Sequence, residues 1–446
     1  MTDLLDGKLR ALQERHIPDA LCARLGELIR NGEPKRLARL APPRLARAWG
    51  EPEPAVLDAF LHGTRLGLFE LEWNLRCPSC TGPSQREGSL LHMKHDGNCD
   101  ICSVQFVGAF DESVEVVWRV HPALRDLSGV DPIAMMALCT QPDPVVRLTV
   151  PAHGAIDREQ ALAPGNYHIL ATDRGLARGM RIDPQPAATA TSELEIVADD
   201  QQLERGAWRR NAGRYQLRLR NRTAKPMDLM IARITEQPWV SGAALAANQS
   251  FRDLFSSELI QPGENFAIRH AAFVFTDIKG STALYERIGD ARAYALVRDH
   301  FQIMIDRVRL HGGAVVKTIG DAVMATFLDP AAATRFALDV LRAFDTYNAA
   351  QQTPDSIIVK VGIHAGPCIA VTLNERLDYF GRTVNMAARI QGLSVGRDVV
   401  LSQATASAPE VGALLEQTGW RAEKFGAELK GIAGACPVVR LQQPAA

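Results

Sequence analysis

The stretch FVFTD (residues 273–277), which runs directly into KGST, decides the fold of the last third of this chain. Its aromatic and β-branched residues are typical of a strand, and the strand ends at Asp277. A second stretch, VVKTIGDAVMATF (315–327), places Lys317 and Asp321 on either side of a tight Ile-Gly turn. Two carboxylates that close apolar strands can hold hard divalent cations through oxygen. Together the two stretches predict a metal site.

A third stretch, LDYFGRTVNMAAR (377–389), adds Asp378, Asn385 and Arg389. A lysine, an asparagine and an arginine beside a metal site can neutralise a polyphosphate. The three stretches therefore point to nucleotide chemistry.

The segments after residue 266 predict an α+β domain. The order is strand, long helix, strand, strand, helix, strand, over residues 271–277, 290–310, 313–318, 322–328, 330–345 and 357–364. This βαββαβ order is the ferredoxin-like arrangement, in which helices back one face of a sheet.

The composition of the chain sets limits on its partners. At 446 residues, with 46% hydrophobic and 23% charged residues, we expect two to four globular domains. The formal charge of −1 gives no overall field that would recruit nucleic acid or anionic lipid. The N-terminus has no signal-peptide pattern, and no apolar run approaches membrane-spanning length. We therefore expect a soluble, cytoplasmic protein without membrane or nucleic-acid partners.

Two Cys-x-x-Cys pairs predict a structural zinc site of the zinc-ribbon type, formed by Cys77, Cys80, Cys99 and Cys102. Four thiolates close the coordination sphere and leave no position for a substrate, so the site would not be catalytic. His92 and His95 are alternative ligands within the loop, and an empty or redox-active thiol cluster is the other interpretation.

The other cysteines are scattered through the chain. Buried, small apolar residues are the commonest role of an isolated free cysteine. We expect that role for Cys22, Cys139, Cys368 and Cys436.

Changes of pattern along the chain suggest five regions. These are a helical N-terminal region (1–75), a zinc-ribbon-like segment (76–130), a β-rich, sandwich-like regulatory domain (131–240), a linker helix (241–265) and the domain described above (266–446). Short helices before residue 75 would also fit a DNA-binding helix pair, although Arg44, Arg47 and Arg65 are only scattered basic residues. The β-rich region is either a structural module or a sensor for a small molecule or a protein.

Four segments of the last domain carry a resemblance to a known family. FTDIKGST, KTIGDAVMATF, VGIHAG and LDYFGRTVNMAAR occur in this order, and residues 266–442 thereby resemble a class III nucleotidyl cyclase. The region before them is more loosely similar to the accessory part found upstream of some bacterial cyclases of this family.

The resemblance implies a two-metal site. Asp277 and Asp321, with the backbone of Ile278, would hold two Mg²⁺ or Mn²⁺ ions. The ribose 3′-hydroxyl of ATP would then attack the α-phosphorus in line, and pyrophosphate would leave.

The resemblance also assigns the nucleotide contacts. Lys317 and Asp378 would read adenine, because a lysine donor to N1 and an aspartate acceptor from the exocyclic amine do not complement guanine. Asn385 would orient the ribose, and Arg389, one helical turn later, would neutralise charge on the α-phosphoryl group. The triphosphate would be bound by Ile278, Lys279, Gly280, Ser281, Thr282 and Lys430, with Arg376 as a weaker candidate. His364 is expected to be a packed residue and not a base.

In this family one catalytic domain supplies the two metal-binding aspartates and the other supplies the nucleotide-reading residues. This chain has a single such domain with both sets, so the resemblance implies a head-to-tail homodimer with two equivalent sites. The predicted function is an adenylate cyclase with an N-terminal regulatory region. The alternatives are a guanylate cyclase, or a catalytically silent nucleotide sensor that controls an N-terminal DNA-binding region.

Overall fold

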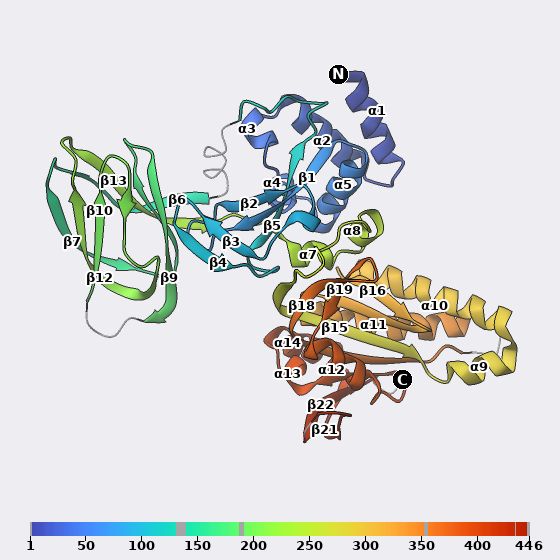
Figure 1. Cartoon of the computed structure of the whole chain (residues 1–446). Helices are drawn as coiled ribbons and strands as arrows, with labels where there is room; N and C mark the ends of the chain where they lie inside the picture. Colours follow the sequence, from blue (N-terminus) through green and yellow to red (C-terminus); the bar gives the residue numbers. More distant parts are fainter. Residues whose placement is uncertain (1, 131–139, 187–190, 352–355, 433, 444–446) are drawn as a thin grey trace. The chain divides into compact units, whose positions relative to one another are not determined.

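The computed structural model describes residues 2–130, 140–186, 191–351, 356–432 and 434–443 (Figure 1). The chain divides into two compact units. The first unit contains residues 1–88, 93–108 and 113–240, and the second contains residues 89–92, 109–112 and 241–446.

The first unit begins with helices that pack beside a small antiparallel sheet. The helices are α1 (Thr2–Gln13), α2 (Asp19–Asn31), α3 (Pro34–Leu37), α4 (Pro42–Trp49) and α5 (Glu53–Arg65). The sheet places β1 (Phe69–Arg76) between β2 (Pro83–Glu87) and β5 (Val114–Val120). Phe60 of α5 stacks on Phe69 of β1 and meets the edge of Trp118 of β5, so aromatic packing fixes the helix on the sheet.

The first unit continues into a region of β-strands that form one eight-stranded sheet. Its strands are β6 (Thr140–Val150), β7 (Ala155–Leu162), β8 (Gly165–Ala171), β9 (Leu176–Pro186), β10 (Ser192–Ala198), β11 (Leu203–Glu204), β12 (Arg209–Asn221) and β13 (Met227–Glu236). The long strand β12 pairs with β9 near its start and with β7 and β10 over its later part. β12 thereby connects β9 with β7 and β10, and these strands share one apolar core. Residues 131–139, which the sequence places at the start of this region, lie outside the described residues.

A hairpin of β3 (Asp96–Cys99) and β4 (Val104–Val107) completes the first unit. After β13, the boundary between the two units lies within β14 (Val240–Ser241).

The second unit has the predicted ferredoxin-like order. Its elements are β15 (Phe266–Ile278), α9 (Ser281–Ile288), α10 (Asp290–Leu310), β16 (Ala314–Ile319), β17 (Ala322–Phe327), α11 (Pro330–Ala350), β18 (Val359–Leu373), β19 (Arg376–Phe380), α12 (Arg382–Gln391), β20 (Asp398–Ser402), α13 (Gln403–Ala406), α14 (Pro409–Thr418), β21 (Arg421–Glu428) and β22 (Ala435–Gln442). The strand order is β16-β17-β15-β18-β20-β22-β21, and its first four members are those of the βαββαβ core. The central strand β15 is antiparallel to both of its neighbours.

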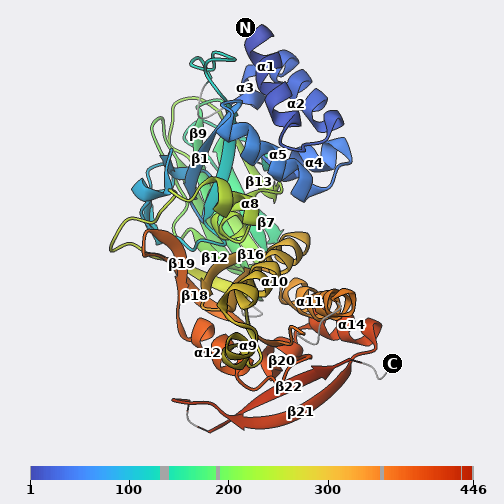
Figure 2. The ribbon, with the colours of Figure 1, turned by 90° about the vertical axis from the view of Figure 1, so that its right-hand side faces the viewer.

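Helices cover both faces of this sheet, whereas the sequence predicts one covered face. Val361 and Ile363 of β18 share a core with α10 and α11 (Figure 2). Gly362 points to the opposite face, where a Cβ would come within 2.2 Å of the backbone nitrogen of Gln391 in α12. Helix α12 and strands β21 and β22, which lie outside the βαββαβ core, contribute to a second apolar cluster there. This cluster covers the second face of the sheet.

The expected linker helix consists of two short helices, α7 (Gly242–Ala246) and α8 (Gln249–Leu254). The side chain of Asn248 accepts a hydrogen bond from the Phe251 N–H, and this N-cap starts a new helix between them. Both helices belong to the second unit, together with η1 (Leu90–His92).

No helix in the described part of the chain is both long enough and apolar enough to cross a membrane.

His300 of α10 lies in the core of the second unit with no exposed surface. Its ring stacks on Phe344 with 5.4 Å between the centroids, and neither ring nitrogen has a hydrogen-bond partner among the described residues. Burial lowers the pKa of His300 to about 4, and the negative charge of Asp321 opposes this shift only in part. The imidazole is therefore neutral in the folded protein.

This burial predicts a pH dependence of stability. The unfolded chain takes up a proton on this imidazole near pH 6.5, whereas the folded chain resists protonation until about pH 4. The free energy of unfolding should thus fall as the pH drops through this window, by roughly 3 kcal/mol. Denaturant unfolding at a series of pH values should show that His300→Leu loses this part of the slope. The exposed control His270→Leu should keep it, and an identical slope in all three proteins would contradict the assignment.

Candidate active site

The two aspartates predicted to bind metal lie side by side at one end of the sheet. Antiparallel pairing of β15 with β17 sets Thr276 opposite Val323, which brings Asp277 next to the turn that carries Asp321. Gly320 makes this turn with φ of 64°, a conformation that favours glycine. The Ile278 N–H donates to a carboxylate oxygen of Asp321 at 3.3 Å, which fixes the orientation of that carboxylate.

The electrostatics of this pair suit a cation. Burial and the neighbouring charge of Asp321 raise the pKa of Asp277, while Lys360, directly opposite on β18, acts in the other direction. Two adjacent carboxylates repel each other, and a hard divalent cation bound through oxygen would remove that repulsion. The donor set of these side chains therefore fits Mg²⁺ or Mn²⁺.

Lys317 and Asp378 come together although they are far apart in the sequence. Lys317 Nζ lies 2.5 Å from a carboxylate oxygen of Asp378, which is only 6% exposed. The other oxygen of Asp378 accepts the Tyr379 N–H at 2.8 Å. The register of β16 against β17 shifts between Val315 and Lys317, which is the signature of a β-bulge next to the lysine.

Asn385 and Arg389 lie one turn apart on α12, as predicted. Asn385 is exposed and Arg389 is half-buried. The guanidinium of Arg389 lies beside Gly431, where a Cβ would be 3.6 Å from Nη2, and the exposed Lys430 immediately precedes this glycine. Within the described residues, no hydrogen bond or ion pair joins either α12 side chain to Asp277 or Asp321. The α12 side chains and the two aspartates are therefore not in direct polar contact within one chain.

The segment 278–282 is less open to phosphate than the sequence suggests. The Ile278 N–H is bonded to Asp321, and the Lys279 N–H donates to the Ile358 carbonyl at 2.8 Å. Gly280 adopts φ of 70° and precedes the first residue of α9, so Ser281 and Thr282 form the N-terminal turn of that helix. Only this later part of the segment has the geometry of a helix N-terminus.

His364 is a packed residue, in line with its prediction. Its Nδ1 lies 2.7 Å from Ser402 Oγ, and burial together with the nearby Arg382 lowers the pKa of its ring.

The four cysteines of the Cys-x-x-Cys pairs converge in the first unit. Their sulfur atoms all lie within 4.8 Å of one another, and all four residues are buried. Four sulfurs bound to one zinc at about 2.3 Å lie about 3.8 Å apart, close to the 3.7 Å between Cys80 and Cys99. His92 and His95 are not members of the cluster. The donor set and its spacing fit zinc.

Backbone groups of the β region stabilise charge on this cluster. The Gly179 N–H of β9 donates to Cys102 Sγ at 3.3 Å, and Arg205 donates to the carbonyls of Gly179 and Cys102. Hydrogen bonds from the other cysteines and from Gly179 lower the pKa of Cys102. A Cβ on Gly179 would come within 2.4 Å of the Ser79 backbone, so the knuckle lies directly against β9.

The isolated cysteines follow the prediction in part. Cys22 and Cys368 are buried, and burial raises the pKa of Cys368 to about 12. Cys436 is only half-buried, because at that position β22 pairs with the edge strand β21 but not with β20, and Cys139 lies outside the described residues.

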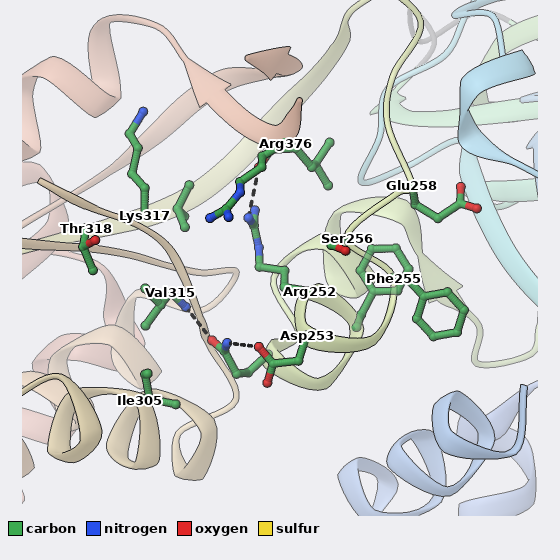
Figure 3. A pocket seen from close by; sticks show the side chains of 14 residues that line it. Arg252, Asp253, Phe255, Ser256, Glu258, Ile305, Val315, Lys317, Thr318 and Arg376 are labelled. Atoms are coloured by element: carbon green, nitrogen blue, oxygen red, sulfur yellow. Dashed lines mark hydrogen bonds between the residues drawn. The ribbon is translucent and has the colours of Figure 1, made fainter. Parts of the chain in front are cut away.

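Sequence patterns did not identify the residues of α8 that lie beside the lysine–aspartate pair. A cavity of about 340 Å³ separates α8 from β16 and β19, and Lys317 and Arg376 line it together with Gln249, Arg252 and Asp253 (Figure 3). Six residues of α8 are too few to reveal a functional pattern.

Comparison with known proteins gives matches to separate parts of the chain. Residues 266–429 match the family model described as "Adenylate and Guanylate cyclase catalytic domain". Residues 4–140 match a second model, described as a family of unknown function (DUF5939).

Adenylate cyclases are among the similar proteins. The adenylate cyclase of Lachancea kluyveri is 35% identical over 164 residues, which cover 32% of this chain and 9% of that protein. Adenylate cyclase 2 of Rhizobium meliloti (strain 1021) is 30% identical over 163 residues, which cover 34% of this chain and 45% of that protein. The crystal structure of the adenylyl cyclase CyaB from P. aeruginosa is 21% identical, with a TM-score of 0.36 over 41% of this chain and 97% of that chain.

This chain spans less than half the length of the two curated relatives. The family model and these relatives support the resemblance of residues 266–429 to class III nucleotidyl cyclases.

Proposed function

We propose that residues 266–446 form the catalytic domain of an adenylate cyclase that converts ATP to 3′,5′-cyclic AMP and pyrophosphate. The contact between Lys317 and Asp378 is the observation that carries this proposal. In such a pair, a cationic donor and an anionic acceptor would be within reach of one purine edge. Adenine offers an acceptor at N1 and a donor at its exocyclic amine, so this pair complements adenine and leaves guanine with unmatched groups.

The remaining residues would act on the ribose and the phosphates. Asp277 and Asp321 would hold two Mg²⁺ or Mn²⁺ ions with the backbone of Ile278, and such ions lower the pKa of a bound hydroxyl and neutralise the triphosphate. Asn385 would orient the ribose, and Arg389 would stabilise charge that develops on the α-phosphoryl oxygens. Lys430, Ser281 and Thr282 would contact the terminal phosphates, together with Gly280 and the side chain of Lys279.

Turnover of ATP and GTP by the purified chain tests this proposal. We expect cyclic AMP from ATP in the presence of Mg²⁺ or Mn²⁺, and a much lower rate with GTP. Asp321→Asn keeps an oxygen for the Ile278 N–H but removes the charge, so it should abolish turnover while leaving the metal-free protein folded. A preference for GTP would identify a guanylate cyclase. Folded protein that binds nucleotide without turnover would indicate a silent sensor.

We further propose that the active form is a head-to-tail homodimer. The proposal is supported by the lack, among the described residues, of any hydrogen bond or ion pair between the α12 side chains and the aspartate pair, because a second copy could bring the two sets together across a two-fold axis.

Complementation tests the shared site. Asp277→Ala chains and Lys317→Ala chains should each be inactive, because every site in either homodimer lacks one required residue. Mixing them should restore activity, since one of the two sites in the heterodimer is intact. Mixtures that contain heterodimers by mass but show no turnover would contradict a site shared between subunits.

We propose that Cys77, Cys80, Cys99 and Cys102 bind one structural Zn²⁺. The converging sulfurs, the Gly179 N–H and the adjacent Arg205 are all suited to a negatively charged tetrathiolate centre. Because the knuckle lies against β9, this metal would fasten the N-terminal sheet to the β region of the same unit. That unit would then be a regulatory region held together by the metal and open to a small-molecule or protein regulator.

Metal analysis should find about one zinc per chain. Cys99→Ser should lose the metal and destabilise the first unit, because zinc binding and folding are coupled in sites of this kind. Cys436→Ser is the matched control and should retain both zinc and stability. Native protein that contains no zinc, yet is folded and has free thiols, would refute the site.

A further inference from the structure

Helix α8 is bonded to both strands that carry the purine-reading pair (Figure 3). Lys317 lies on β16 and Asp378 on β19, and these two strands are not neighbours in the sheet. Pairing within the sheet therefore does not by itself fix the distance between β16 and β19, and contacts from outside the sheet can do so.

Gln249 forms the link to the lysine strand. Its side chain is only 6% exposed, and its amide oxygen accepts the Val315 N–H at 2.8 Å. Its amide nitrogen donates to Asp253 at 2.8 Å, which fixes the orientation of the amide. Val315 borders the bulge before Lys317, and a bulge re-aims the side chain that follows it. Gln249 thus holds the backbone that sets the direction of Lys317.

Arg252 forms the link to the aspartate strand. Its Nη1 donates to the Leu377 carbonyl at 3.0 Å, and its Nε donates to the Ala246 carbonyl at 2.7 Å. The guanidinium also lies 5.5 Å from the ring centroid of Tyr379. Leu377 and Tyr379 flank Asp378, so Arg252 contacts the backbone on one side of this aspartate and an aromatic ring on the other. In the described part of the chain Arg252 forms no ion pair. Its guanidinium group donates to two backbone carbonyls instead, which indicates a structural role.

The helix itself is firmly anchored. Phe251 is 1% exposed and stacks on Phe255 with 5.3 Å between the ring centroids. Farther along the chain, the backbone of Ile260 forms two hydrogen bonds with the hydroxyl of Thr372 on β18, at 2.8 and 2.7 Å. These contacts keep Gln249 and Arg252 at fixed positions against the sheet.

We propose that Gln249 and Arg252 are positioning residues that set the geometry of Lys317 and Asp378, and thereby the selectivity for adenine over guanine. The inference rests on the proposed function, in which this pair reads the purine. Discrimination between the two bases requires that a donor and an acceptor meet defined atoms of one edge, so a small displacement of either side chain lowers selectivity before it abolishes binding.

The test measures the preference for ATP over GTP in full-length variants. Gln249→Leu removes the acceptor for the Val315 N–H, and Arg252→Lys keeps the charge but cannot bond both carbonyls as a fork. In both variants we expect the ATP-to-GTP ratio of kcat/KM to fall about tenfold, since misplacement by about 1 Å can cost up to about 10²-fold. Gln249→Glu keeps an oxygen for the Val315 N–H but loses the donor to Asp253, so it should retain only part of the preference that Gln249→Leu loses.

Arg309→Ala is the matched control. It removes the exposed ion pair between Arg309 and Asp253 at the outer end of the same network, without touching β16 or β19. It should leave the nucleotide ratio unchanged. A merely structural role for α8 would lower the rates with ATP and GTP equally, and thermal unfolding checks that the variants are folded.

The ratio of affinities for 3′-deoxy-ATP and 3′-deoxy-GTP, which lack the attacking hydroxyl, provides a second readout that needs no turnover. Wild-type protein that prefers 3′-deoxy-ATP but forms no cyclic nucleotide would refute the proposed function and leave this test intact. Unchanged ratios in both Gln249→Leu and Arg252→Lys would overturn the positioning role. So would a wild-type protein without any preference between the two analogues.

Discussion

The pairing of β15 with both β17 and β18 is the constraint on which the candidate site depends. Because β15 is antiparallel to both neighbours, Asp277 near its end meets the turn that carries Asp321 on one side and Lys360 on the other. A shift of this register by one residue would turn Asp277 to the opposite face. The large apolar core on the α10 and α11 side prevents such a shift, since Ala272 and Val274 would then leave it.

The site combines two kinds of electrostatic arrangement. Asp277 and Asp321 repel each other, so the folded chain carries a local strain that a bound cation would relieve. Lys317 and Asp378 attract each other, so their geometry is already set in the absence of a ligand. The first arrangement suits ion binding and the second suits recognition, because preorganised groups lose little freedom when the ligand binds.

In the first unit, the cysteine cluster lies where the N-terminal sheet meets the β region. The knuckle that follows β1 lies against β9 so closely that Gly179 has no room for a side chain. Its sulfur atoms and those of the β3–β4 hairpin meet at that contact. The contact therefore makes the N-terminal sheet and the β region parts of one compact unit.

Local sequence patterns were sufficient to predict the βαββαβ order, the long helix over residues 290–310, the four clustered cysteines and the residues of the Asp277–Asp321 and Lys317–Asp378 pairs. These features follow from local patterns, namely periodic apolar residues, turns and short motifs with fixed spacing. Packing of the folded chain, by contrast, set the helical cover on both faces of the sheet, the bonding of the Ile278 and Lys279 amides, and the hydrogen bonds from α8 to β16 and β19. Those outcomes depend on contacts between residues more than 40 positions apart, such as Arg252 with Leu377 and Ile278 with Asp321. A local pattern carries no information about which distant backbone group will accept or donate such a bond, because chain packing alone brings the two together.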